Sequence, residues 1–208
     1  MEIQMGSCCE NKCSEIDLLK EKQKNVLITV MVINLVMFFV EFSYGLISSS
    51  TALLADSLDM LGDSSVYAFS LFVLGKGDKW KASAAFLKGI IITCFGIFVL
   101  IEAIRKISIE TLPTSEVMGV VGAIALGANL ICLFLLLRHK NDDVNMKSTW
   151  ICSRNDIIAN TGVIAAAFLV NYFSSKWPDI IVGLIMSTVF LKSAFSVLSE
   201  SISVYRNA

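Results

Sequence analysis

The chain has 208 residues, of which 55% are hydrophobic and 17% are charged. Its formal net charge of −1 excludes the clustered basic excess that nucleic-acid binding requires. The apolar composition is typical of a membrane protein, so we expect its partners in the lipid bilayer.

Six segments are long and apolar enough to cross a bilayer as helices. A transmembrane helix needs about 20 predominantly apolar residues, and its backbone polar groups must bond within the segment. The expected spans are residues 26–48, 52–74, 84–107, 116–138, 149–172 and 179–198. The sequence therefore predicts an all-α membrane protein, a six-transmembrane-helix bundle over residues 26–208 that follows an N-terminal arm over residues 1–25.

The N-terminal arm contains a cysteine cluster, "CCENKC", with Cys8, Cys9 and Cys13. A polar run precedes the first span, so this span is not a cleaved signal peptide. If the arm is helical, Cys9 and Cys13 share a face, and their thiolates could capture a soft metal ion. Three cysteines in a flexible arm also need not bind anything, and both interpretations stay open.

Basic residues near the span ends predict that both termini lie in the cytoplasm. On the side of the termini we expect Lys12, Lys20, Lys22, Lys24, Lys76, Lys79, Lys81, Arg138, Lys140 and Lys147, against Arg105, Lys106 and Lys176 on the other. Cysteines of the arm then face a reducing compartment, where disulfides are not expected.

The second span carries three aspartates in "LLADSLDMLGDSSV". A charge in the hydrocarbon costs about 2.5–3.5 kcal/mol on insertion scales, so a functional role is the first hypothesis. Asp59 and Asp63 are four residues apart and share one helix face. Because they repel each other and burial disfavours their charged forms, the pair should bind either a divalent metal or protons. Asp56 fits an interfacial or first-turn carboxylate, and we keep it as an accessory candidate.

The fifth span offers a second pair at the same spacing, Cys152 and Asp156 in "WICSRNDIIANTGV". Two ligands from each of two helices suit a tetrahedral ion such as zinc, and a thiolate favours zinc or cadmium over magnesium and calcium. Asp156 lies only about seven residues into its expected span, whereas Asp63 lies near mid-membrane. The fifth helix must therefore begin earlier, near Val144, or the site must open toward a water-filled cytoplasmic cavity.

Three stretches together resemble the transmembrane domain of the cation diffusion facilitator family: "GLISSSTALLADSLDMLGDSSVYAFSL", "WICSRNDIIANTGVIAAAFLV" and "FLKSAFSVLSESISVY". The resemblance covers nearly all of residues 26 to 205. It implies a six-helix antiporter that exports zinc, or cadmium, cobalt, iron or manganese, in exchange for protons and without a cofactor. The family's ligand positions fall on Asp59, Asp63, Cys152 and Asp156.

Two departures from the family pattern affect what the resemblance implies. Cys152 stands where the family usually has histidine or aspartate, so the choice of ion is in question. The chain also ends at Ala208, where most members continue into a cytoplasmic domain. We therefore expect a truncated member of the bacterial inner membrane, and a homodimer through the transmembrane helices is left open.

Two alternatives belong to other functional classes. An intramembrane aspartyl protease also needs two aspartates on different membrane helices, and "MLGD" superficially resembles its signature. The glycine expected two residues before Gly62 is replaced by Met60, and no proline-containing motif accompanies the signature. An organic cation/proton exporter is weakened by the absence of an aromatic cage around the acidic pairs.

Overall fold

The computed structural model describes the backbone of residues 7–73, 78–138 and 144–207 and the side chains at 24–68, 71, 83, 86–138, 153–154, 156–199 and 202. Every element in this part of the chain is a helix. The helices are α1 (Ser7–Ile47), α2 (Thr51–Val73), α3 (Asp78–Ser108), α4 (Ser115–Leu137), α5 (Val144–Phe173) and α6 (Trp177–Asn207).

Five of the expected spans are confirmed as helices long and apolar enough to cross a membrane. They are Lys24–Ile47, Phe86–Ser108, Ser115–Leu137, Asp156–Phe173 and Trp177–Ser199. The remaining expected span is helical as well, because α2 has 23 residues, but its three aspartates set its composition apart from the other five. The predicted all-helical class is therefore correct, and a count of six spans stays a prediction.

Four helices continue beyond the apolar segments that the sequence predicted. The extensions are at the starts of α1, α3 and α5 and at the end of α6. The polar turns that extend these helices are helical too, whereas hydropathy marks only the apolar part of each helix. The start of α5 at Val144 confirms the earlier beginning that Asp156 required.

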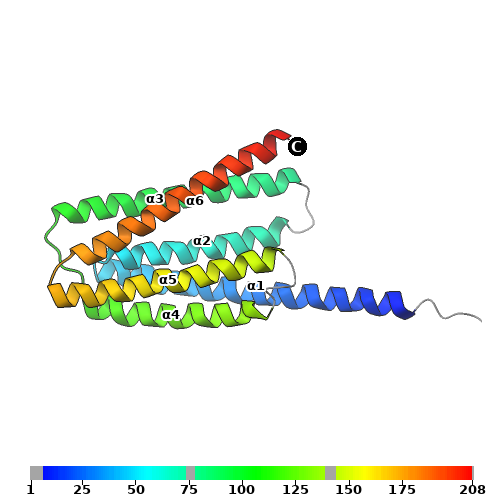
Figure 1. Ribbon diagram of the computed structural model, residues 1–208, viewed down its shortest axis with the longest axis horizontal. Coiled ribbons are helices and arrows are strands. Elements are labelled where there is room, and N and C mark those ends of the chain that lie inside the picture. Colours follow the sequence, from blue (N-terminus) through cyan, green and yellow to red (C-terminus); the bar gives the residue numbers. More distant parts are fainter. Residues whose placement is uncertain (1–6, 74–77, 139–143, 208) are drawn as a thin grey trace, which may run out of the picture.

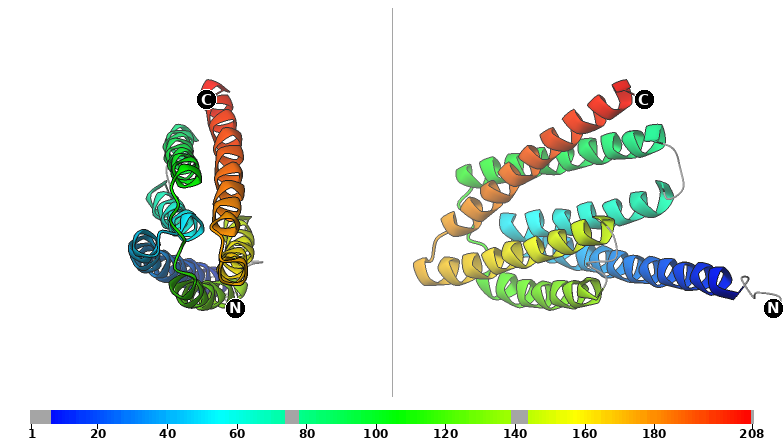
Figure 2. Two further views of the ribbon diagram at one scale, coloured as in Figure 1. Left: turned by 90° about the vertical axis from the view of Figure 1, so that its left-hand side faces the viewer. Right: turned by 45° about the vertical axis from the view of Figure 1, so that its right-hand side comes forward.

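The six helices form two groups (Figure 1). Helices α3 and α6 pack along each other as a pair, and α1, α2, α4 and α5 form the second group through the α1–α2, α4–α5 and α1–α4 contacts. Helix α2 contacts α1, α3, α5 and α6, so it joins the two groups. Figure 2 shows the same division from two other sides, with α3 and α6 apart from α1 and α4.

A tight turn of serines connects α1 to α2. Ser49 has φ of 52°, the Ser50 N–H donates to the Gly45 carbonyl (2.9 Å) and the Ser49 N–H donates to the Leu46 carbonyl (3.3 Å). This is the Schellman arrangement, which satisfies carbonyls at the end of a helix and reverses the chain. The side-chain oxygen of Ser50 then accepts from the Leu53 N–H (3.0 Å) and caps the new helix.

Asp179 of α6 supplies the other acceptors for the start of α2. One carboxyl oxygen of Asp179 accepts from the Thr51 N–H (2.8 Å), and the other accepts from the Ala52 N–H (3.0 Å) and the Ser50 hydroxyl (2.6 Å). The side chain of Asp179 is fully buried. A carboxylate at a helix N-terminus satisfies unpaired donors and complements the helix dipole.

Lys106 of α3 completes this buried cluster. Its ammonium lies 3.7 Å from the Asp179 carboxylate and donates to the Ser49 carbonyl. Lys106 is only 3% exposed, so both charges are removed from solvent. Each charge is therefore neutralised by the other, because no water is available to solvate it. The cluster therefore fixes α2, α3 and α6 relative to one another at this end of the bundle.

Glycines allow close helix contacts in the same region. A Cβ added at Gly183 of α6 would lie 2.6 Å from Thr51 Cγ2, and one at Gly96 of α3 would lie 2.8 Å from Leu191 Cγ. Ser187 donates to the Gly96 carbonyl (2.8 Å) across the α3–α6 contact. Small residues and interhelical hydrogen bonds of this kind are the usual means of packing helices in lipid.

We expect Asp179→Ala to lower the stability of the protein by about 3–5 kcal/mol, because it leaves the Lys106 ammonium buried without its partner. Thermal unfolding of the purified protein in detergent, followed by circular dichroism, measures this change. Glu110→Gln removes an exposed carboxylate at the same end and serves as the control. An unfolding midpoint for Asp179→Ala equal to that of wild type would show that the buried Asp179–Lys106 pair does not stabilise the protein.

Gly183→Ala and Gly127→Ala should have opposite effects on stability. At Gly183 the new methyl group meets the branched Thr51 side chain, so we expect a loss of about 1–3 kcal/mol from overpacking. At Gly127 no atom lies within 4 Å of the new methyl group, and the helix should gain up to about 1 kcal/mol. The same melting experiment tests both, and equal midpoints for the two variants would refute the contact.

Candidate functional site

A cavity of about 530 Å³ lies between α2, α3, α5 and α6. Most of its wall is apolar, with Phe95 of α3 and Met186 and Phe190 of α6 among the lining residues. Its charged lining consists of Asp59 and Asp63 of α2, Asp156 of α5 and Lys88 of α3. Three carboxyl groups and one ammonium group therefore share one space in a largely apolar surrounding.

The two predicted pairs of ligands contribute three carboxylates to this cavity. Asp59 and Asp63 lie one turn apart on α2 and are half-buried. The Asp63 carboxyl interacts with the Asp156 carboxyl of α5 through a side-chain hydrogen bond and accepts from the Tyr67 hydroxyl (3.3 Å). Two carboxyl groups that hydrogen-bond to each other must share a proton, or bind a cation in its place, because two bare negative charges would repel.

The predicted set is only partly visible in the structure. Among the side chains that the structure describes, no three histidine, cysteine or acidic residues are close enough together to hold a metal ion. Cys152 lies in α5 one turn before Asp156, but its side chain is outside the described residues. The side chains of Cys8, Cys9 and Cys13 are outside them too, although their backbone belongs to α1.

The interpretation of Asp56 as an interfacial or first-turn carboxylate is wrong. Asp56 is 1% exposed, and one of its carboxyl oxygens accepts from the Asn160 side-chain amide of α5 (3.2 Å). Its position near the start of α2 suggested contact with water. Packing against α5 excludes water instead, because Asn160 occupies the facing position one turn after Asp156.

A further buried acid, on α1, interacts electrostatically with Asp56. Glu41 of α1 is fully buried, and within the described part of the chain neither of its carboxyl oxygens has a hydrogen-bond partner. One oxygen of Asp56 and the amide oxygen of Asn160 lack partners in the same way. Glu41 was recognisable in the sequence as a charge inside the first span, but its proximity to α2 was not.

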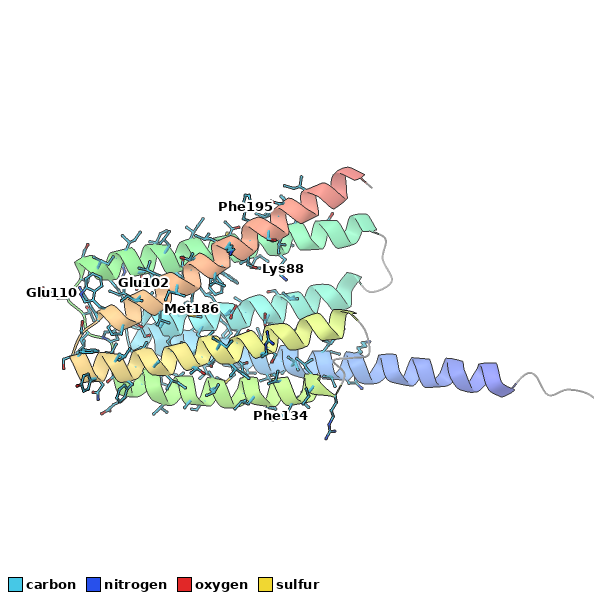
Figure 3. The ribbon with its side chains drawn as sticks, viewed as in Figure 1. Lys88, Glu102, Glu110, Phe134, Met186 and Phe195 are labelled. Carbon is cyan, nitrogen blue, oxygen red and sulfur yellow. The ribbon has the colours of Figure 1, made fainter. Side chains whose placement is uncertain are left out.

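Lys88 was not among the residues predicted for the site. It falls within the third expected span, and a charge inside a span was the signal that could have identified it. Figure 3 shows Lys88 on α3, beside the space that separates this helix from α2. Its presence in the cavity lining makes it the cationic member of the site.

The chain matches one known protein family and is similar to several known proteins. Residues 27–204 match the cation efflux transmembrane domain. The cadmium, cobalt and zinc/H(+)-K(+) antiporter of Bacillus velezensis is 24% identical over 196 residues, covering 87% of this chain and 62% of that protein.

Two further relatives have related names. The zinc transporter ZitB of Pectobacterium atrosepticum is 28% identical, covering 85% of this chain and 59% of that protein. The metal cation efflux system protein CzcD of Cupriavidus metallidurans is 25% identical, with coverages of 76% and 56%. The chain thus spans less than two thirds of the length of these relatives.

The proteins of this family are transporters and not enzymes, so the alternative of an intramembrane protease is set aside. With five helices able to cross a membrane, the chain is an integral, multi-pass membrane protein. The matched domain covers most of the chain and contains every residue that lines the cavity, and the chain therefore belongs to the cation efflux family.

Proposed function

We propose that the protein exports a divalent transition metal, zinc foremost, from the cytoplasm in exchange for protons. The observation that carries this proposal is the single cavity that receives Asp59 and Asp63 from α2 and Asp156 from α5. Oxygen ligands from two helices can surround one ion, and the apolar wall strengthens their electrostatic attraction for it.

The same carboxyl groups would carry the protons. Without metal, the Asp63 and Asp156 carboxyls share a proton, since they hydrogen-bond to each other. A divalent cation that enters from the cytoplasm displaces the protons, because ligands must be deprotonated to coordinate it. Once the site faces the other side, incoming protons compete for the same oxygens and release the metal.

Cys152 is proposed as the fourth ligand. It lies on α5 at the i−4 position relative to Asp156, the spacing that places two side chains on one helix face. A thiolate beside three carboxylates favours zinc and cadmium over magnesium and calcium. The names of the relatives, which mention zinc, cadmium and cobalt, support a metal of this group as the substrate.

The membrane arrangement is part of the proposal. We infer that α2 is a sixth span, because its 23 residues suffice to cross a bilayer and its neighbours α1, α3, α5 and α6 cover it. The bias of basic residues supports cytoplasmic termini, and the bacterial relatives support an inner membrane. The cysteine cluster of residues 8–13 would then meet metal ions on the cytoplasmic side, and a homodimer through the membrane helices is compatible with this arrangement.

Removal of the central carboxylate should abolish transport. In proteoliposomes with an imposed pH gradient, we expect Asp63→Asn to reduce zinc and cadmium flux by about 100-fold or more, since loss of even a partner of a metal ligand costs about 10- to 100-fold in affinity. Glu102→Gln is the control, because Glu102 pairs with Arg105 (2.7 Å) and does not line the cavity.

The outcomes separate this function from its alternative. Normal metal flux in Asp63→Asn would refute the site. Failure of the wild-type protein to move any divalent metal, with transport of an organic cation against protons instead, would favour the organic cation exporter.

The choice of metal tests Cys152 directly. Replacing Cys152 with Asp or His should move the selectivity order among zinc, cadmium, cobalt, manganese and iron, with cadmium losing most in the aspartate variant, because a hard oxygen replaces a soft sulfur. Competition between these metals for transport provides the measurement. Cys132→Ala, which changes a buried cysteine of α4, is the control. If the order stays that of wild type, Cys152 is not a ligand.

A further inference from the structure

Lys88 lines the cavity beside three aspartates, but its ammonium group cannot coordinate a metal ion. It belongs to the cavity wall together with Asp59, Asp63 and Asp156, and its charge acts electrostatically on Asp63. Within the described part of the chain, its ammonium makes no direct ion pair or hydrogen bond. A half-buried lysine beside a cation site therefore carries a positive charge that no single carboxylate neutralises.

The backbone of α3 is fixed close to Lys88. The next residue is Gly89, where an added Cβ would lie 2.7 Å from the Leu198 side chain of α6. This close contact holds α3 against α6, so Lys88 cannot leave the cavity by a small movement of its helix. The flexible four-carbon side chain of Lys88, with three hydrogen-bond donors at its end, can extend or fold back while the helix stays in place.

The charges of the cavity explain why the Lys88 ammonium is tolerated there. In the cavity lining, three carboxylates and one ammonium leave two negative charges, and the proposed Cys152 thiolate would add a third, so a divalent ion offsets most of the negative charge. Without Lys88, the loaded site would keep one more negative charge in an apolar surrounding, where an unbalanced charge is costly. The ammonium and the metal are also attracted by the same oxygens and repel each other, so the presence of one weakens binding of the other.

We propose that Lys88 is a tethered cation that competes with the transported metal for Asp59, Asp63 and Asp156 and sets the affinity of the site. This inference rests on the proposed function of the same cavity. When the metal is absent, the Lys88 ammonium is attracted toward the carboxylates across the cavity, and when the metal arrives the two cations repel each other. Its repulsion keeps binding weak enough for the metal to leave.

Three variants of the 208-residue chain test the proposal. Lys88→Gln removes the charge and keeps most of the side-chain length, whereas Lys88→Arg keeps the charge. Lys192→Gln removes an exposed lysine of the neighbouring helix α6 that does not line the cavity. Zinc affinity of each protein in detergent is measured by competition with a chromophoric chelator, and zinc flux is measured in proteoliposomes.

We expect Lys88→Gln to bind zinc about tenfold more tightly or better, since a nearby like charge is lost from a site of low dielectric. Its flux should show a lower KM together with a lower maximal rate, because release becomes slow. Lys88→Arg and Lys192→Gln should remain close to wild type. Simple structural damage would instead weaken binding, so the direction of the change separates the two causes.

Unchanged or weaker zinc affinity in Lys88→Gln, with an unfolding midpoint like that of wild type, would overturn the inference and leave the proposed function standing. Lys88→Arg behaving like Lys88→Gln would also overturn it, because the charge would then not be the cause. Wild-type protein that binds neither zinc nor cadmium would overturn the proposed function and this inference together.

Discussion

The buried carboxylate of Asp179 is the interaction on which the rest of the bundle depends. It makes three kinds of interaction: it accepts hydrogen bonds from the first N–H groups of α2, it accepts one from the Ser50 hydroxyl, and it neutralises the Lys106 ammonium. Because Asp179, Lys106 and Ser50 are buried, water cannot replace these partners, so an unsatisfied helix start or a lone ammonium would be costly. Because Asp179 of α6 binds both the start of α2 and Lys106 of α3, one carboxylate positions three of the four walls of the cavity.

Helix α2 carries three aspartates within a segment that the sequence predicted to cross the membrane, and its place in the bundle explains how the fold accommodates them. Contacts with α1, α3, α5 and α6 cover it on several sides. Asp56 faces α5, whereas Asp59 and Asp63 face the cavity. The exposed apolar side chains of the other helices, such as Phe39, Phe134 and Phe195, provide the surface that lipid can contact.

The sequence predicted the parts of this structure that depend on local pattern. Apolar runs identified all six helices, and the i, i+4 spacing placed Asp59 and Asp63 on one face, which the cavity confirms. Features that depend on the partner helix were not predictable in this way. Neither the burial of Asp56 against Asn160 nor the approach of Lys88 to the aspartates follows from spacing, because both arise from contacts between distant segments. For the same reason, the role of Cys152 stays a prediction.

The hydrogen bond between Asn160 and Asp56 has a mechanical consequence. It joins α2 and α5 close to the place where Asp63 meets Asp156, so the two helices are linked at two points along their contact. A slide of one past the other by a single turn, about 5.4 Å, would break both links and pull the two halves of the acidic cluster apart. Any motion that keeps an ion bound between these helices must therefore carry α2 and α5 as one rigid unit, with the relative displacement taken up at their contacts with other helices.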